Sequence, residues 1–118
     1  MSQSDAFAAL EAQLWKILEP YREHLEPNAI YGLPTLRWPG ARAHDFFAGV
    51  RVAPRHVALH FLPVIDHPEV MDGASDALRG RLKGKATFNF RADDEPLVAE
   101  LPAIVRRGFD AYREAHER

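Results

Sequence analysis

The chain has 118 residues, of which 47% are hydrophobic and 27% are charged, and its formal net charge is -2. This length and composition predict one globular domain with its own core rather than a disordered segment. The sequence contains no cysteine, which excludes disulfides, thiolate zinc sites and cysteine nucleophiles.

The charge balance and the hydropathy pattern also limit the partners. A slightly negative chain exerts no long-range attraction on nucleic acid or on an anionic membrane. No apolar stretch approaches the roughly 20 residues of a membrane span, and the N-terminus lacks the basic start and apolar centre of a secretory signal. We therefore expect no nucleic acid, no membrane and a cytoplasmic location.

The N-terminal segment predicts a helix followed by irregular structure. Apolar residues recur at helical spacing over residues 4–18, with Ser4 or Asp5 available as the N-cap. Pro20 cannot continue the helical hydrogen bonds, so the helix is expected to stop or kink there. Residues 28–43 contain several glycines and prolines among apolar side chains, which predicts an irregular edge strand and a loop.

The clearest hairpin lies within residues 45–64. Pairing Val52 with Val57 also aligns Val50 with Leu59, so that the apolar side chains of both strands share one face. The opposite face is mixed rather than plainly polar. It is predicted to carry Phe47, Gly49, Arg51, Ala58, His60 and Leu62.

The C-terminal half predicts alternating helices and one further strand. Ser75 is placed to cap a short helix that ends near Gly84. Residues 85–91 alternate between apolar and polar side chains, as in a half-buried strand. A final helical segment follows, and Pro102 is expected to kink it or to divide it into two helices.

Together these elements predict an α+β domain that spans residues 1–118. Its antiparallel sheet has three to four strands, and the N- and C-terminal helices pack against this sheet to form a two-layer sandwich. A helical crossover precedes the strand at residues 85–91, so the sequence leaves open which strand is its neighbour.

One long stretch resembles a known family. The run HFLPVIDHPEVMDGASDALRGRLKGKATFNF, followed by LPAIVRRGFDAYREA, is similar to short bacterial proteins of unknown function. In those proteins a strand ending in His-x-x-Pro leads through a helix to a Gly-Lys-x-x-Phe-Asn-Phe strand. The layout resembles the YdhG-like domain, also called domain of unknown function 1801, and the Gly-x-Pro element at residues 32–34 matches it too.

The resemblance implies an α/β sandwich that has been compared with frataxin, and an iron-chaperone role has been proposed for one branch of the family. Fold alone does not carry function. Frataxins use a dense acidic ridge, whereas the first helix here offers Asp5, Glu11 and Glu19, spread among apolar residues. We assign no metal site and leave the cofactor unknown.

The candidate ligand site lies on the mixed face of the hairpin. In the expected register His60 faces Gly49, which leaves room above the neighbouring strand, and Arg51 shares that face. An imidazole and a guanidinium between aromatic walls would suit a small acidic or aromatic ligand. The candidate ligand-binding residues are His60, Arg51, Tyr31, Trp38, Phe47 and Lys85. In the alternative interpretation, a helix covers this face and His60 only satisfies a backbone group.

Catalysis finds little support in the sequence. The serines lie at the N-terminus or at a helix cap, and no hydrolase, kinase or dinucleotide motif is present. An enzyme would need His60 paired with an acid such as Asp45. Two hypotheses therefore remain: a non-enzymatic module with a small-ligand or metal face on the sheet, or a homodimerising interaction domain with exposed apolar residues such as Trp15, Phe47 and Leu62.

Overall fold

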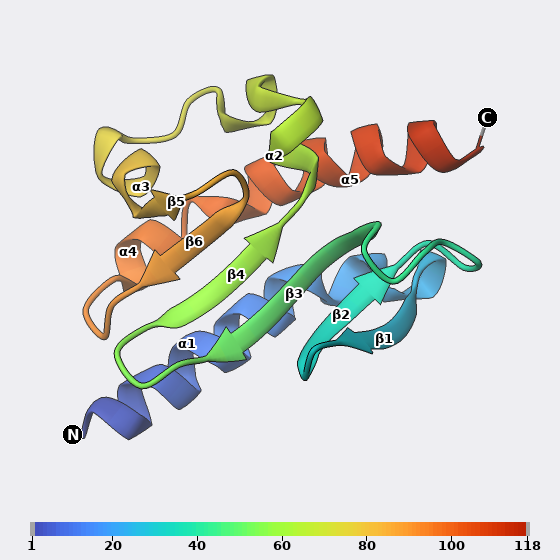
Figure 1. The fold of residues 1–118 in the computed structure, drawn as a ribbon. Coiled ribbons are helices and arrows are strands. Elements are labelled where there is room, and N and C mark those ends of the chain that lie inside the picture. Colours follow the sequence, from blue (N-terminus) through green and yellow to red (C-terminus); the bar gives the residue numbers. More distant parts are fainter. Residues whose placement is uncertain (1, 118) are drawn as a thin grey trace.

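Six antiparallel strands form one sheet in the computed structural model, which describes residues 2–117 (Figure 1). They lie in the order β1-β2-β3-β4-β6-β5 across the sheet. The strands are β1 (Glu26–Ile30), β2 (Leu33–Arg37), β3 (Phe46–Val52), β4 (Val57–Phe61), β5 (Leu82–Lys83) and β6 (Thr87–Phe90). The predicted α+β class is confirmed, but the prediction of three to four strands was too low.

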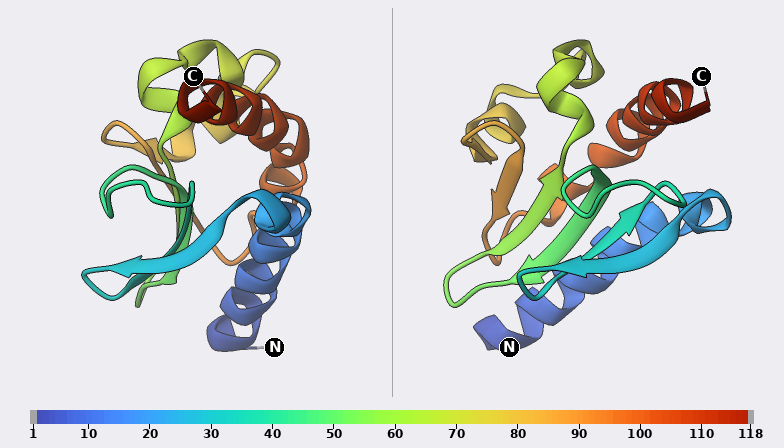
Figure 2. Two further views of the ribbon diagram at one scale, coloured as in Figure 1. Left: turned by 90° about the vertical axis from the view of Figure 1, so that its right-hand side faces the viewer. Right: turned by 45° about the vertical axis from the view of Figure 1, so that its right-hand side comes forward.

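The two long helices cover one face of the sheet, and within residues 2–117 no helix lies over the opposite face of β3 and β4 (Figure 2). The α-helices are α1 (Gln3–Leu18), α2 (Pro63–Asp66), α3 (Asp76–Arg81), α4 (Glu95–Val98) and α5 (Leu101–Glu117). The 3-10 turn η1 (Glu19–His24) continues α1, and the 3-10 turn η2 (Pro68–Met71) follows α2. Within residues 2–117, every helix is too short or too polar to traverse a lipid bilayer.

Helix α1 begins slightly earlier than the sequence predicts. The side chain of Ser2, rather than Ser4 or Asp5, is the N-cap and accepts a hydrogen bond from the backbone N–H of Asp5. The α-helix ends at Leu18 because Pro20 follows, and the chain continues as the 3-10 turn η1.

The additional strands come mainly from the segment that was expected to be irregular. β1 and β2 form a hairpin whose turn residues Tyr31 and Gly32 have φ angles of 50° and 79°. Positive φ at both positions is typical of a tight two-residue turn. Proline is tolerated here because β1 is an edge strand and β2 pairs with β3 only from Thr35 onward.

The central register is the predicted one. Val52 pairs with Val57 and Val50 with Leu59, and Leu59 also pairs with Phe88. β6 is therefore the neighbour of β4, which the sequence left open. The buried side chains of these strands pack against α1 and α5, and the core includes Leu10, Leu14, Val50, Leu59, Phe61, Phe88, Ile104 and Val105.

A β-bulge reverses the predicted orientation of Phe47. Leu36 pairs with Ala48 while Arg37 pairs with Phe46, so Phe47 is the extra residue of β3. It is fully buried, and its ring centroid lies 5.5 Å from that of Phe109 on α5. The sequence placed Phe47 on the face away from the helices, which was wrong because strict alternation fails at a bulge.

Pro102 divides the C-terminal helical segment, as the sequence allows. The chain forms α4 and then α5, with a break at Ala99 and Glu100. The last helix begins at Leu101, so Pro102 falls in its first turn, where a missing backbone N–H is tolerated.

Candidate functional site

His60 lies near the middle of the sheet face that α1 and α5 leave open. It pairs with Gly49 of β3 and with Thr87 of β6. Because Leu59 points into the core, the next residue on β4 points to the opposite face. Nδ1 of His60 lies 3.2 Å from Oγ1 of Thr87, within hydrogen-bond distance.

The space expected above Gly49 is occupied by β2. A Cβ atom on Gly49 would lie 2.8 Å from the backbone oxygen of Pro34 and 3.2 Å from the side chain of Leu33. The prediction of free room at Gly49 was therefore wrong. The glycine allows the close approach of β2 instead, which leaves the β4–β6 side of His60 as the accessible part.

Burial lowers the pKa of His60, and the positive charge of Arg51 lowers it further. Both effects disfavour the imidazolium, so the ring is neutral at neutral pH. A neutral imidazole has one N–H donor and one acceptor. His60 can therefore donate to a ligand while the charge at this face comes from neighbouring residues.

Charge is strongly segregated in this part of the chain. Residues 46–65 and 77–92 carry seven of the fifteen lysines and arginines and none of the seventeen acidic residues. Arg79 donates to the carbonyl of Met71, and Arg81 forms an ion pair with Asp94. The other cations are exposed and form no ion pair with any described residue; they are Arg51, Arg55, Lys83, Lys85 and Arg91.

The predicted aromatic walls are not at this face. Tyr31 lies at the tip of the β1–β2 hairpin with 90% of its surface exposed, and its ring centroid is 6.1 Å from that of His44. The backbone N–H of Trp38 donates to the hydroxyl of Tyr112 on α5. Phe47 lies in the core. The structure brings together His60 and Arg51, with Lys85 in the turn that leads into β6.

Two residues that the sequence did not connect with His60 lie next to it in the sheet. Lys83 of β5 pairs with Thr87, which in turn pairs with His60. The alternation of residues 85–91 placed Thr87 on the polar face, but the pairing of β6 with β4 was needed to bring it to His60. The two-residue strand β5 has no periodic signal of its own.

The residues considered for catalysis and for metal binding are arranged differently. Asp45 pairs with His116, at 2.7 Å between Oδ2 and Nε2, and not with His60. Among residues 2–117, no cluster of three or more histidine, aspartate or glutamate side chains is arranged to hold a metal ion.

Exposed apolar residues do not gather into one surface. The large hydrophobic side chains that are exposed, Tyr31, Val52 and Ile65, belong to different parts of the fold. Leu62 is only partly exposed, and Trp15 packs partly against the core beneath the guanidinium of Arg22.

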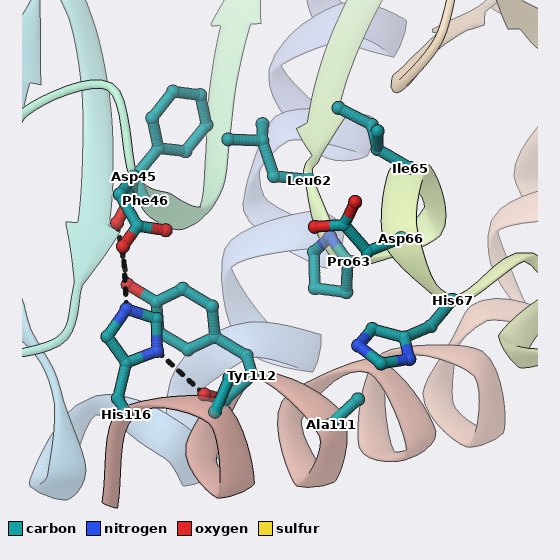
Figure 3. A pocket seen from close by; sticks show the side chains of 11 residues that line it. Asp45, Phe46, Leu62, Pro63, Ile65, Asp66, His67, Ala111, Tyr112 and His116 are labelled. Carbon is teal, nitrogen blue, oxygen red and sulfur yellow. Dashed lines mark hydrogen bonds and ion pairs between the residues drawn. The ribbon is translucent and has the colours of Figure 1, made fainter. Parts of the chain in front are cut away.

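A cleft that the sequence did not predict lies away from this face, between α2, α5 and the start of β3 (Figure 3). Its volume is about 310 Å³. Polar residues of three segments line it, among them Asp45, Asp66 and His116. Their separation along the chain left no local motif, and only the contact of the end of α5 with Asp45 brings them together.

The fold matches that of a solved bacterial protein. YdhG from Bacillus subtilis, a protein of the DUF1801 family, superimposes with a TM-score of 0.52 and 12% sequence identity over 94% of this chain and 92% of that one. The predicted resemblance to YdhG-like proteins is therefore confirmed at the level of the fold, whereas the comparison with frataxin gains no support. No protein-family model and no curated protein matches the sequence.

Proposed function

We propose that the protein is a non-enzymatic binding module that holds a small, multiply charged anion on the open face of its sheet. One observation carries the proposal: the exposed cations of this region have no ion-pair partner among the described residues, and no acidic residue lies in the strands around them. Elsewhere in the fold, Arg22, Arg37 and Arg113 are each paired with a glutamate.

The spacing of the cations favours a ligand with more than one anionic group. Arg51 flanks His60 on β3, whereas Lys83 lies across Thr87 on the other side. Three strand spacings separate β3 from β5, which corresponds to about 14 Å between their backbones. The long side chains of Arg51 and Lys83 can reach toward His60 from both sides, so a dicarboxylate or a phosphate-bearing metabolite could bridge them, with Arg51 as the bidentate partner of one group.

The aromatic ligand that the sequence also allowed is the weaker choice. Tyr31, Trp38 and Phe47 do not line the open face, so these three side chains form no aromatic wall for stacking. The ligand is therefore held by charge and hydrogen bonds, and its affinity should fall as the ionic strength rises.

The test is a calorimetric titration with citrate and with pyrophosphate at low salt. We expect one of these anions to bind, and Arg51→Gln to weaken binding by about tenfold, since a charge-assisted hydrogen bond contributes on the order of 1.5–3 kcal/mol. Lys16→Gln is the matched control, because it removes an exposed cation from α1 on the other side of the sheet.

Equal weakening by the two variants would mean that the anion only screens the overall charge, which contradicts the proposal. No binding by either anion would also contradict it. If the protein then eluted as a homodimer, the interaction hypothesis would be favoured instead.

A further inference from the structure

The cleft between α2 and α5 has one apolar and two polar parts (Figure 3). Its apolar surface comes from the start of β3, the end of β4, α2 and one face of α5. These residues are Phe46, Leu62, Pro63, Ile65, Ala111 and Ala115. Ile65 is 46% exposed, which leaves it available for contact with a bound molecule.

The polar groups of the cleft at the end of α5 contact one another. His116 places Nδ1 at 2.7 Å from the carbonyl oxygen of Tyr112 and Nε2 at 2.7 Å from Oδ2 of Asp45. Both ring nitrogens of His116 are thus engaged by groups of the protein itself. The Tyr112 hydroxyl donates to the backbone oxygen of Asp45. What remains free here is the second carboxylate oxygen of Asp45.

The polar part at the end of α2 is not satisfied in this way. The carboxylate of Asp66 points into the cleft in Figure 3 and forms no hydrogen bond or ion pair with the described residues. Nδ1 of His67 lies 3.3 Å from Oε1 of Glu69, so this ring nitrogen is engaged outside the cleft.

The free carboxylate oxygens of Asp66 and Asp45 are acceptors, and among the described residues no lysine or arginine lines the cleft. A ligand that satisfies these two carboxylates must supply hydrogen-bond donors, and a positive charge would complement them. We infer that this cleft binds a small organic amine, with its ammonium group at Asp66 and an apolar body against Ile65. The inference is independent of the anion site, since the two sites share no residue and require opposite charge.

Three probes with the same aromatic ring and different head groups test the inference. They are 2-phenylethylamine, 2-phenylethanol and 3-phenylpropanoate, titrated into ¹⁵N-labelled protein and followed by amide chemical shifts. We expect the amine to shift the amides of Ile65, Asp66 and Ala115, and the alcohol and the carboxylate to bind at least about tenfold more weakly. Binding of the carboxylate as tightly as the amine would overturn the inference, as would shifts confined to other surfaces.

Two variants locate the site. Asp66→Asn should weaken amine binding by about tenfold, whereas Asp110→Asn, which changes an exposed carboxylate of α5 outside the cleft, should leave it unchanged. Ala115→Leu places a larger side chain in the cleft and should also weaken binding. Because alanine and leucine are both good helix formers, the substitution preserves the helix propensity of α5. Unchanged affinity in Asp66→Asn, or tighter binding of zinc or manganese than of the amine at Asp66, would overturn the inference.

Discussion

Gly108 of α5 lies directly against the ring of Phe61 on β4. A Cβ atom on Gly108 would be 2.2 Å from Cζ and 2.7 Å from Cε2 of that ring. The glycine therefore lets α5 approach the sheet closely enough for Phe61 to be fully buried. No unusual backbone angle is involved, so the requirement at this position is one of space.

The first prediction concerns this contact. Gly108→Ala should lower the free energy of unfolding by about 1–3 kcal/mol, because the ring or the helix must move to accommodate the methyl group. Gly80→Ala in α3 is the control, since no atom lies within 4 Å of its Cβ position; it should raise the stability by about 0.5–1 kcal/mol. Urea denaturation of both variants measures the difference, and equal effects of the two changes would show that α5 is not this close to Phe61.

The second prediction concerns the buried carboxylate of Asp94. It accepts hydrogen bonds from Nε and Nη2 of Arg81, at 2.6 and 2.9 Å, and from the backbone N–H of Arg91 at 2.7 Å. Asp94→Asn should lower the stability by about 2–4 kcal/mol, because it removes the charge-assisted bonds and leaves Arg81 unpaired. Asp93→Asn, at an exposed neighbour, should change it by less than about 0.5 kcal/mol.

The same pair predicts a pH dependence. The hydrogen bond from Arg81 is the largest cause that holds the pKa of Asp94 below its usual value. A lowered pKa in the folded state stabilises the fold above the unfolded pKa of about 3.9 and loses this contribution as the pH falls through the folded value. Denaturation curves of the native chain and of Asp94→Asn should therefore converge below about pH 4. A constant difference down to pH 2 would contradict the assignment.

The regular parts of this fold could be predicted from the sequence because they follow simple periodicity. The pairing of Val50 with Leu59 results from two alternating strands joined by a short loop, and α1 results from one helical stripe of apolar residues. The β1–β2 hairpin was missed because its prolines obscure the strand pattern. They are compatible with strands here only because of where β1 and β2 lie in the sheet.

The candidate site was harder to predict for the same physical reason. His60 and Arg51 were placed on one face by alternation alone. Phe47 was placed on the wrong side because a bulge depends on how β2 pairs with β3, which no pattern within β3 reveals. The contact between Asp45 and His116 joins segments that are 71 positions apart, so only the packing of α5 could disclose it.

The third prediction concerns the hydroxyl of Tyr112, which joins three segments of the fold. It accepts from the backbone N–H of Trp38 and donates to the backbone oxygen of Asp45, both at 2.8 Å. Tyr112→Phe leaves these two groups unpaired and should lower the stability by about 1–3 kcal/mol. Tyr31→Phe, at an exposed residue, should have almost no effect.

The alkaline range gives an independent measurement of the same group. Burial raises the pKa of Tyr112 to about 12. A raised pKa in the folded state stabilises the fold below the unfolded pKa of about 10, and this contribution is lost as the pH rises through the folded value. The stability difference between the native chain and Tyr112→Phe should therefore shrink above about pH 10. A tyrosinate absorbance titration in which Tyr112→Phe loses no late-titrating group would contradict the prediction.

The fourth prediction concerns His60 and connects the electrostatics of the open face with ligand binding. Because burial is the larger cause of its lowered pKa and Arg51 the smaller, Arg51→Gln should raise the pKa only part of the way to the ordinary value of about 6.5. Lys16→Gln should leave it unchanged. The lowered pKa stabilises the fold above about pH 6.5, and this contribution is lost as the pH falls through the folded value.

A bound anion adds negative charge near the ring and should raise the pKa of His60. Proton NMR of the imidazole, recorded with and without pyrophosphate, measures each change. If neither Arg51→Gln nor the anion changes the pKa of His60, the ring does not experience the charges of this face.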